Sequence, residues 1–149
     1  MPKEGYVSDL TLDEKVMMGI VRASEQFKKR YSALFRNYGL TFSQYSVLRA
    51  LSSSKDGENT ITNIRKIMLV SGANMTGIAK RLAKKGFIIR KGDPSDERIT
   101  LLQITPKGLQ TLRNVMDEKN EYLTAVLSDL SGDAKQRILS QLKVILKKA

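Results

Sequence analysis

The chain contains no cysteine, no histidine and no tryptophan among its 149 residues. Without cysteine there can be no disulfide bond and no thiol redox sensor. Zinc sites of the Cys/His type and histidine-based acid–base catalysis are excluded for the same reason. These absences argue against most classes of enzyme. We therefore expect a binding protein that is not an enzyme and that needs neither a cofactor nor a metal.

Long apolar runs are also missing. No run approaches the ~20 residues that a membrane span needs, and residues 1–10 lack the basic and then apolar layout of a signal peptide. Hydrophobic residues make up 41% of the chain and charged residues 28%, which is typical of a globular domain. We expect one domain over residues 1–149, located in the cytoplasm and without a membrane partner.

Acidic residues are absent from one central segment. Residues 59–92 carry eight basic side chains and no acidic one, whereas residues 1–58 have a net charge of +2 and residues 93–149 a net charge of +1. A charge excess confined to one segment is typical of a surface that binds a polyanion. A solvated basic face without a partner is the alternative that the charge alone leaves open.

Helix start signals and apolar spacing predict six helices. Thr11 with Glu14, and Thr41 with Gln44, have the spacing of capping boxes, and apolar residues at helical spacing follow both. Gly39 is a plausible end for the first helix. Shorter helices are predicted at 60–69 and 71–85, and the last two begin near Thr105 and Ser131.

The helix predicted at 71–85 is amphipathic and ends at Gly86. Its apolar residues, expected in the core, are Met75, Ile78, Ala79 and Leu82. Its opposite face carries polar and basic side chains, namely Asn74, Thr76, Lys80, Arg81 and Lys84, together with Gly77. This helix therefore has one face for the core and one for a partner.

Two strand-like runs follow, at 87–90 and 99–104, around a turn-rich stretch at 92–97. Two helices followed by a hairpin are the layout of a winged helix-turn-helix, whose second helix enters the DNA major groove. The predicted fold class is mainly α (α+β), with this lobe at 41–105. The wide apolar stripes of the helices at 10–39 and 106–149 need a partner surface, and an intrachain bundle is the alternative to a dimerisation region.

The same residues resemble a known family. SGANMT (71–76) and KRLAKKGFI (80–88) are similar to the recognition helix and first wing strand of the MarR family, and DPSDER (93–98) resembles its wing tip. ITPKG (104–108) resembles the start of its fifth helix, so the resemblance spans essentially the whole chain. It implies a homodimer that binds a pseudo-palindromic double-stranded DNA operator, with half-sites about 34 Å apart. It also implies a transcription regulator, in most cases a repressor, that a small lipophilic or phenolic effector releases.

The resemblance and the layout together assign roles to single residues. Arg98 is expected in the minor groove, with Asp96 orienting it; a simple ion pair at the wing tip is the alternative. Asn74 and Thr76 are expected at base edges, or else as a helix cap or in solvent. The basic residues other than Arg98 are expected to contact phosphates. The full set of expected DNA contacts is Ser71, Ala73, Asn74, Thr76, Gly77, Lys80, Arg81, Lys84, Arg90, Lys91 and Arg98.

The other interpretations have less support. Tyr31, Tyr38 and Tyr45 are candidates for lining an effector pocket, although lone aromatic residues are also typical of a core. Asp93, Asp96 and Glu97 resemble a metal cluster but are better explained as turn formers. The alternative function is a winged-helix module that binds protein or RNA; aromatic residues for base stacking make up only 6% of the chain, which argues against single-stranded RNA.

Overall fold

The computed structural model describes residues 5, 8–68 and 72–149, and its helices and strands follow the predicted order. The elements are α1 (Leu12–Arg36), α2 (Phe42–Ser52), the 3₁₀ turn η1 (Lys55–Gly57), β1 (Glu58–Thr60), α3 (Ile61–Met68), α4 (Gly72–Lys84), β2 (Ile88–Asp93), β3 (Asp96–Ile104), α5 (Pro106–Val126) and α6 (Gly132–Lys148). The predicted winged helix-turn-helix is confirmed, because α3 and α4 are followed by the β2–β3 hairpin.

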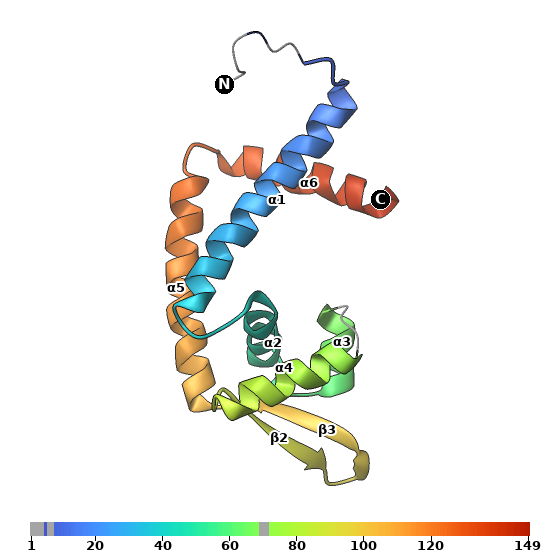
Figure 1. Cartoon of the computed structure of the whole chain (residues 1–149), viewed down its shortest axis with the longest axis vertical. Helices are drawn as coiled ribbons and strands as arrows, with labels where there is room; N and C mark the ends of the chain where they lie inside the picture. Colours follow the sequence, from blue (N-terminus) through green and yellow to red (C-terminus); the bar gives the residue numbers. More distant parts are fainter. Residues whose placement is uncertain (1–4, 6–7, 69–71) are drawn as a thin grey trace.

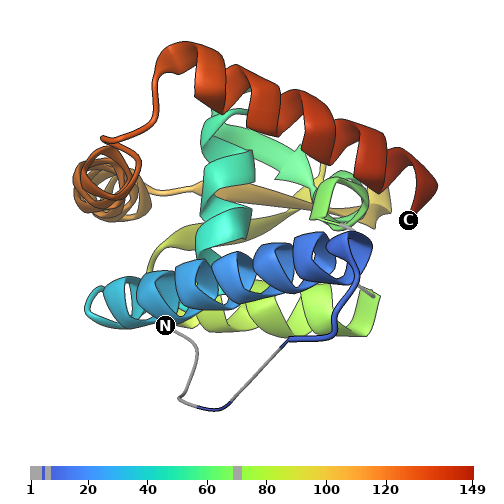
Figure 2. The same cartoon turned by 90° about the horizontal axis from the view of Figure 1, so that it is seen from above.

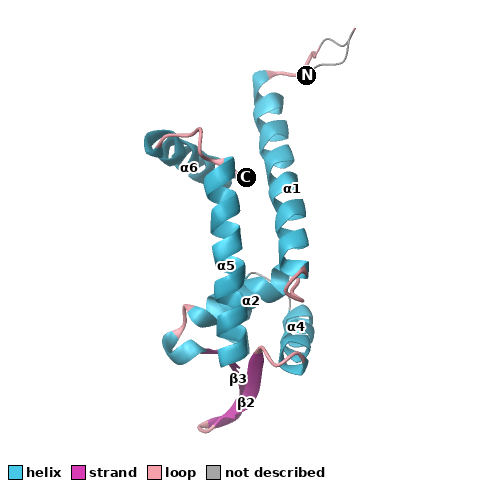
Figure 3. Ribbon diagram, turned by 90° about the vertical axis from the view of Figure 1, so that its left-hand side faces the viewer, coloured by secondary structure: helices cyan, strands magenta, loops and turns pink. Residues whose placement is uncertain are grey.

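The molecule has a lobe from which two long helices extend (Figure 1). The lobe contains α2, α3, α4 and the sheet, and the β2–β3 hairpin projects from the end farthest from α6. Helices α1 and α5 leave the lobe side by side (Figure 3). Seen from above, α6 runs along one side of the molecule and α1 along the other (Figure 2). No helix in the described ranges is both long and apolar enough to cross a bilayer.

The predicted caps determine where the helices begin. The Thr11 and Thr41 hydroxyls accept hydrogen bonds from the backbone N–H groups of Glu14 and Gln44. Only the second pair forms a full capping box in the described part of the chain, because Gln44 Oε1 also accepts from the Thr41 N–H at 3.1 Å. The Thr60 hydroxyl caps α3 in the same way, whereas Ser71, predicted to cap α4, lies outside the described residues.

The sheet differs from the prediction in two places. Strand β1 was not predicted; it pairs antiparallel with β3, which gives the strand order β1-β3-β2. The predicted turn at 92–97 is too long, because β2 continues to Asp93 and β3 begins at Asp96. The Asp93 carboxylate accepts hydrogen bonds from both the backbone N–H and the hydroxyl of Ser95. This local contact closes the hairpin over two residues.

The core lies entirely within the lobe and the ends of the helices that join it. The buried apolar residues run from Phe35 to Val115 and include the predicted stripe of α4. At the end of α4, Gly86 has a φ of 80°, and this left-handed conformation lets the Phe87 N–H reach the Leu82 carbonyl at 3.0 Å. Phe87 thereby enters the core.

The helices outside the lobe expose their apolar faces. No residue of α6 in this single chain is buried, and Leu139 and Leu146 are 51% and 73% exposed. The first half of α1 is similar, with Leu12 77% and Met17 55% exposed. Apolar surface of α6 and of the first half of α1 is therefore not covered by the described residues of this chain, although the second half of α1 packs on α5.

The junction between α5 and the sheet generates a first prediction. A Cβ atom on Gly108 would lie 2.3 Å from the Phe87 carbonyl oxygen and 2.8 Å from Ile104 Cγ1. We expect Gly108→Ala to lower the free energy of unfolding by about 1–3 kcal/mol, the typical cost of overpacking a core. Urea denaturation at one fixed protein concentration measures this.

The matched control is Gly132→Ala at the start of α6, where an added Cβ meets nothing within 4 Å. We expect no loss of stability there, because alanine is the better helix former. A Gly108→Ala variant that is as stable as the Gly132→Ala variant would contradict the close packing of α5 on Phe87 and Ile104.

Candidate nucleic-acid interface

Helix α4 presents a basic face to solvent. Its apolar side is seated in the core, where Met75, Ala79 and Leu82 have no exposed surface and Ile78 is 6% exposed. Lys80, Arg81 and Lys84 are exposed on the other side, and the ion pairs among the described residues involve none of them. These three cations are therefore available to an anionic partner.

The polar residues near the start of α4 are placed unequally. Asn74 is exposed and Thr76 is half-buried, and both have contacts within the protein. Ser71 and the side chain of Ala73 fall outside the described part of the chain. Asn74 also lines a small hollow of about 300 Å³ between α4 and the start of α2, together with Arg81 and Thr41.

Gly77 has a neighbour within its own helix. A Cβ at this position would lie 3.3 Å from Arg81 Nη1, so the guanidinium of Arg81 packs over the glycine. The space that glycine leaves on this face is thus occupied by a flexible cationic side chain. The contact with Arg81 therefore favours a packing role for Gly77, which was the alternative considered from the sequence, over close approach to a DNA backbone.

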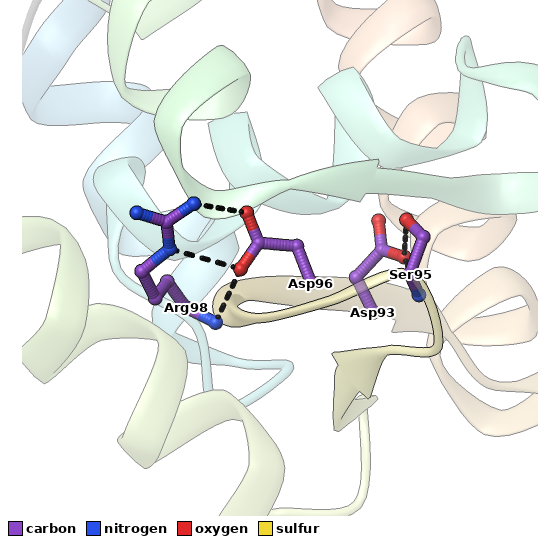
Figure 4. A network of polar contacts seen from close by, with 4 residues as sticks. All are labelled: Asp93, Ser95, Asp96 and Arg98. Carbon is purple, nitrogen blue, oxygen red and sulfur yellow. Dashed lines mark hydrogen bonds and ion pairs between the residues drawn. The ribbon is translucent and has the colours of Figure 1, made fainter.

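At the wing tip, Asp96 holds Arg98 in one orientation (Figure 4). Arg98 Nε donates to Asp96 Oδ1 at 3.0 Å and Nη2 donates to Oδ2 at 3.1 Å, and the backbone N–H of Arg98 donates to Oδ1. The side chain of Arg98 is 90% exposed and that of Asp96 29%. An arginine aligned in this way retains donors that point into solvent.

The two cations of β2 are not equivalent. Arg90 is exposed, whereas Lys91 Nζ lies 2.6 Å from Glu58 Oε2 and donates to Gln103 Oε1 at 3.4 Å. Sequence reasoning did not identify Glu58, which comes from the unpredicted strand β1. A phosphate that binds Lys91 has to compete with this carboxylate.

The three tyrosines meet at the junction of α1, α2 and α5. Tyr45 is 7% exposed and stacks on Phe35 at 4.4 Å between ring centroids, and its hydroxyl accepts from Lys119 Nζ at 2.8 Å. Tyr38 donates to Glu118, and this hydrogen bond raises the pKa of Tyr38. Tyr31 stacks on Phe35 at 5.9 Å, and burial raises its pKa.

Two hollows open beside this junction. The larger, about 970 Å³, lies along α2 and α3 and includes Tyr45, Phe42, Arg49 and Met68 in its lining. The smaller, about 310 Å³, lies between α1, α2 and α5 and includes Tyr31 in its lining. Tyr38 lines neither hollow.

The wing-tip ion pair generates a prediction about pH. The side-chain and backbone hydrogen bonds from Arg98 lower the pKa of Asp96 below its ordinary 3.8. Since the folded-state pKa is lowered, the pair is intact at neutral pH and is lost only as the pH falls through that lowered value. A ¹³C NMR titration of the Asp96 carboxyl should find the lowered pKa, and Arg98→Ala should raise it. An Asp96 that titrates at or above 3.8 in the wild type would contradict the pair.

Comparison with known proteins agrees with this geometry. A family model described as MarR family matches residues 38–99. The HTH-type transcriptional regulator SarZ of Staphylococcus haemolyticus is 26% identical over 144 residues, which cover 95% of this chain and 93% of SarZ.

Two solved structures are similar over most of the chain. A MarR family transcriptional regulator from Streptomyces coelicolor in complex with DNA has a TM-score of 0.82 at 20% identity, covering 97% of this chain and 92% of that one. The organohalide-sensing regulator RdhR, in its 2,4-dichlorophenol-bound form, has a TM-score of 0.81 at 14% identity, covering 95% and 85%. The family model over residues 38–99, the relative along nearly the whole chain and the shared winged-helix fold together make this chain similar to MarR family transcriptional regulators.

Proposed function

We propose that two copies of this chain bind a pseudo-palindromic duplex DNA operator and regulate transcription in the cytoplasm, as a repressor that covers a promoter. One observation carries the proposal: the exposed cations Lys80, Arg81 and Lys84 of α4 and the aligned Arg98 of the wing are free of competing carboxylates other than Asp96 in the described part of the chain. A helix and a hairpin with this chemistry match the major groove and the adjacent backbone.

Each residue then has a role in this complex. Ser71, Ala73, Asn74 and Thr76 are proposed to reach base edges, as the N-terminal region of a recognition helix does. Gly77 would approach the DNA backbone once the Arg81 side chain packed over it turns to a phosphate. The cations Lys80, Arg81, Lys84, Arg90 and Lys91 bind phosphates, which position the protein without reading sequence. Arg98, oriented by Asp96, enters a minor groove whose negative potential favours an arginine.

The proposed dimer is formed by the helices outside the lobe, at 10–39 and 106–149. Helix α6 buries none of its residues in the single chain, and exposed apolar side chains also follow the first half of α1. Exposed apolar surface of this extent is typical of an interface. Two copies related by a twofold axis would present two lobes, spanning 41–105, to half-sites about 34 Å apart.

A small lipophilic or phenolic effector is proposed to release the DNA. The hollow of about 970 Å³ beside Tyr45 is large enough for a small aromatic compound, and the structurally similar regulator RdhR binds 2,4-dichlorophenol. The hollow beside Tyr31 is the second candidate. A ligand there changes DNA affinity only if it binds one arrangement of the lobes better than another.

The first experiment is to select bound duplexes from a random library and to measure binding of Arg98→Ala to the selected operator. We expect this variant to lose about 1–3 kcal/mol of binding free energy, because the wing loses the arginine proposed to enter the minor groove. Fluorescence anisotropy measures the loss, and light scattering should show the same oligomeric state as the wild type. A duplex RNA of the same sequence tests the alternative of RNA binding.

Arg113→Ala is the matched control, because Arg113 is exposed on α5 outside the lobe. It removes the same charge and should leave operator affinity unchanged. Equal affinities for Arg98→Ala and the wild type would show that the wing has no role in binding. A wild-type protein that binds no duplex at low salt would overturn the proposed function itself.

The effector proposal has a separate test. We expect 2,4-dichlorophenol, added to the preformed protein–operator complex, to lower the affinity, and Ala50→Trp, which fills the larger hollow, to reduce that response. A response that is the same in both proteins would exclude this hollow as the binding site.

A further inference from the structure

The end of helix α4 is held by contacts from two directions. The helix ends at Lys84, and Lys85, Gly86 and Phe87 connect it to β2. On one side lies the turn between α1 and α2, and on the other lies the start of α5. The turn follows α1, and α5 is itself one of the helices that extend from the lobe.

Lys85 makes the contact to the first side. Its ammonium group donates to the Gly39 carbonyl at 2.5 Å and to Gln44 Oε1 at 3.4 Å. Gln44 is the buried capping residue of α2, 2% exposed, and its position is itself determined by the hydrogen bond from the Thr41 N–H. Lys85 thus connects the end of α4 to the turn between α1 and α2 and to the capped start of α2.

The start of α5 makes the contact to the second side. Lys107 Nζ donates to the Lys85 carbonyl at 2.7 Å and lies 5.1 Å from the centroid of the Phe87 ring. The Thr105 hydroxyl donates to the Gly86 carbonyl at 2.7 Å. A cation beside the carbonyls that end a helix is favourable, because those groups lack partners within the helix and carry its negative dipole end.

Lys84 and Lys85 therefore differ, although they are neighbours of the same type in the same basic segment. The structure gives Lys84 no ion pair within the described residues, and it lies on the exposed face of α4. Lys85 has its ammonium group bound to the carbonyl of another element. We propose that Lys85 is a positioning residue for DNA recognition, which sets the angle of α4 and makes no phosphate contact.

The proposal rests on the proposed DNA-binding function. Its physical basis is that a small tilt at one end of a helix displaces the other end in proportion to the helix length. Helix α4 has 13 residues and is therefore about 20 Å long. Lys85 acts at one end, and the residues proposed to reach base edges lie at the other. A tilt of about 5° at the end held by Lys85 would move the opposite end by roughly 2 Å over that length, which is enough to break hydrogen bonds to bases.

The experiment compares Lys84→Met with Lys85→Met. Each variant loses one charge and keeps an unbranched side chain. Anisotropy titrations use the operator selected by the wild type and a scrambled duplex of equal length, at several salt concentrations. For Lys85→Met we expect the ratio of operator to scrambled affinity to fall about tenfold, the equivalent of one mismatched base pair, with an unchanged salt slope. For Lys84→Met both duplexes should weaken alike, and the salt slope should fall by about one.

Lys85→Arg supplies the rescue, because a longer cationic donor can still reach the Gly39 carbonyl. It should restore the affinity ratio, which a general loss of stability would not explain. A thermal melt run in parallel checks folding, and Lys85→Gln is measured in the same way if Lys85→Met does not fold.

Two outcomes would overturn the inference. A salt slope that falls by about one in Lys85→Met would make Lys85 a phosphate contact like Lys84. An affinity ratio equal to that of the wild type would show that the contact to Gly39 does not position α4. Both results are distinct from failure of the proposed function, in which the wild type itself binds no duplex.

Discussion

The burial of one side of α4 is the constraint on which the chemistry of its other side depends. Met75 and Leu82 are completely buried, and each contributes about 1.5–3 kcal/mol relative to an exposed position. Successive residues of a helix are about 100° apart around its axis, so rotating α4 by one residue would bring a lysine or polar side chain into the core. The apolar stripe thus determines which residues face outward, and Lys80, Arg81 and Lys84 are among them.

The net charge of the central segment overstates the number of cations that are available to DNA, because some of them have contacts within the protein. Eight basic residues lie between 59 and 92, but Lys85 is bound to the Gly39 carbonyl and Lys91 to Glu58. Lys85 is therefore not counted among the cations that replace counterions on DNA, and Lys91 is counted only once a phosphate displaces Glu58. The salt dependence of binding reports that number. The pair of Lys91 and Glu58 links β2 to β1 across β3, so it also supports the base of the wing.

Features carried by local sequence were predictable. The caps at Thr41 and Thr60, the buried stripe of α4 and the order of helices and strands all follow from neighbouring residues. Strand β1 was missed because three half-buried polar residues show no alternation of apolar and polar side chains. The contact of Lys85 with Gly39 joins residues 46 positions apart, and no local pattern encodes it. The DNA contacts of the site residues remain predictions.

Helix α5 is the element through which the lobe and the remaining helices influence each other. It contacts the lobe near Lys107 and again near Lys119, about 18 Å further along the helix axis. Two separated points of contact determine the orientation of α5 relative to the lobe, whereas a single contact would allow the helix to rotate about that point. In the proposed dimer, the distance between the two copies of α4 therefore depends on the angle of α5. Tyr45, which binds Lys119 at the second point and lines the larger hollow, is the contact through which a ligand in that hollow would alter the distance.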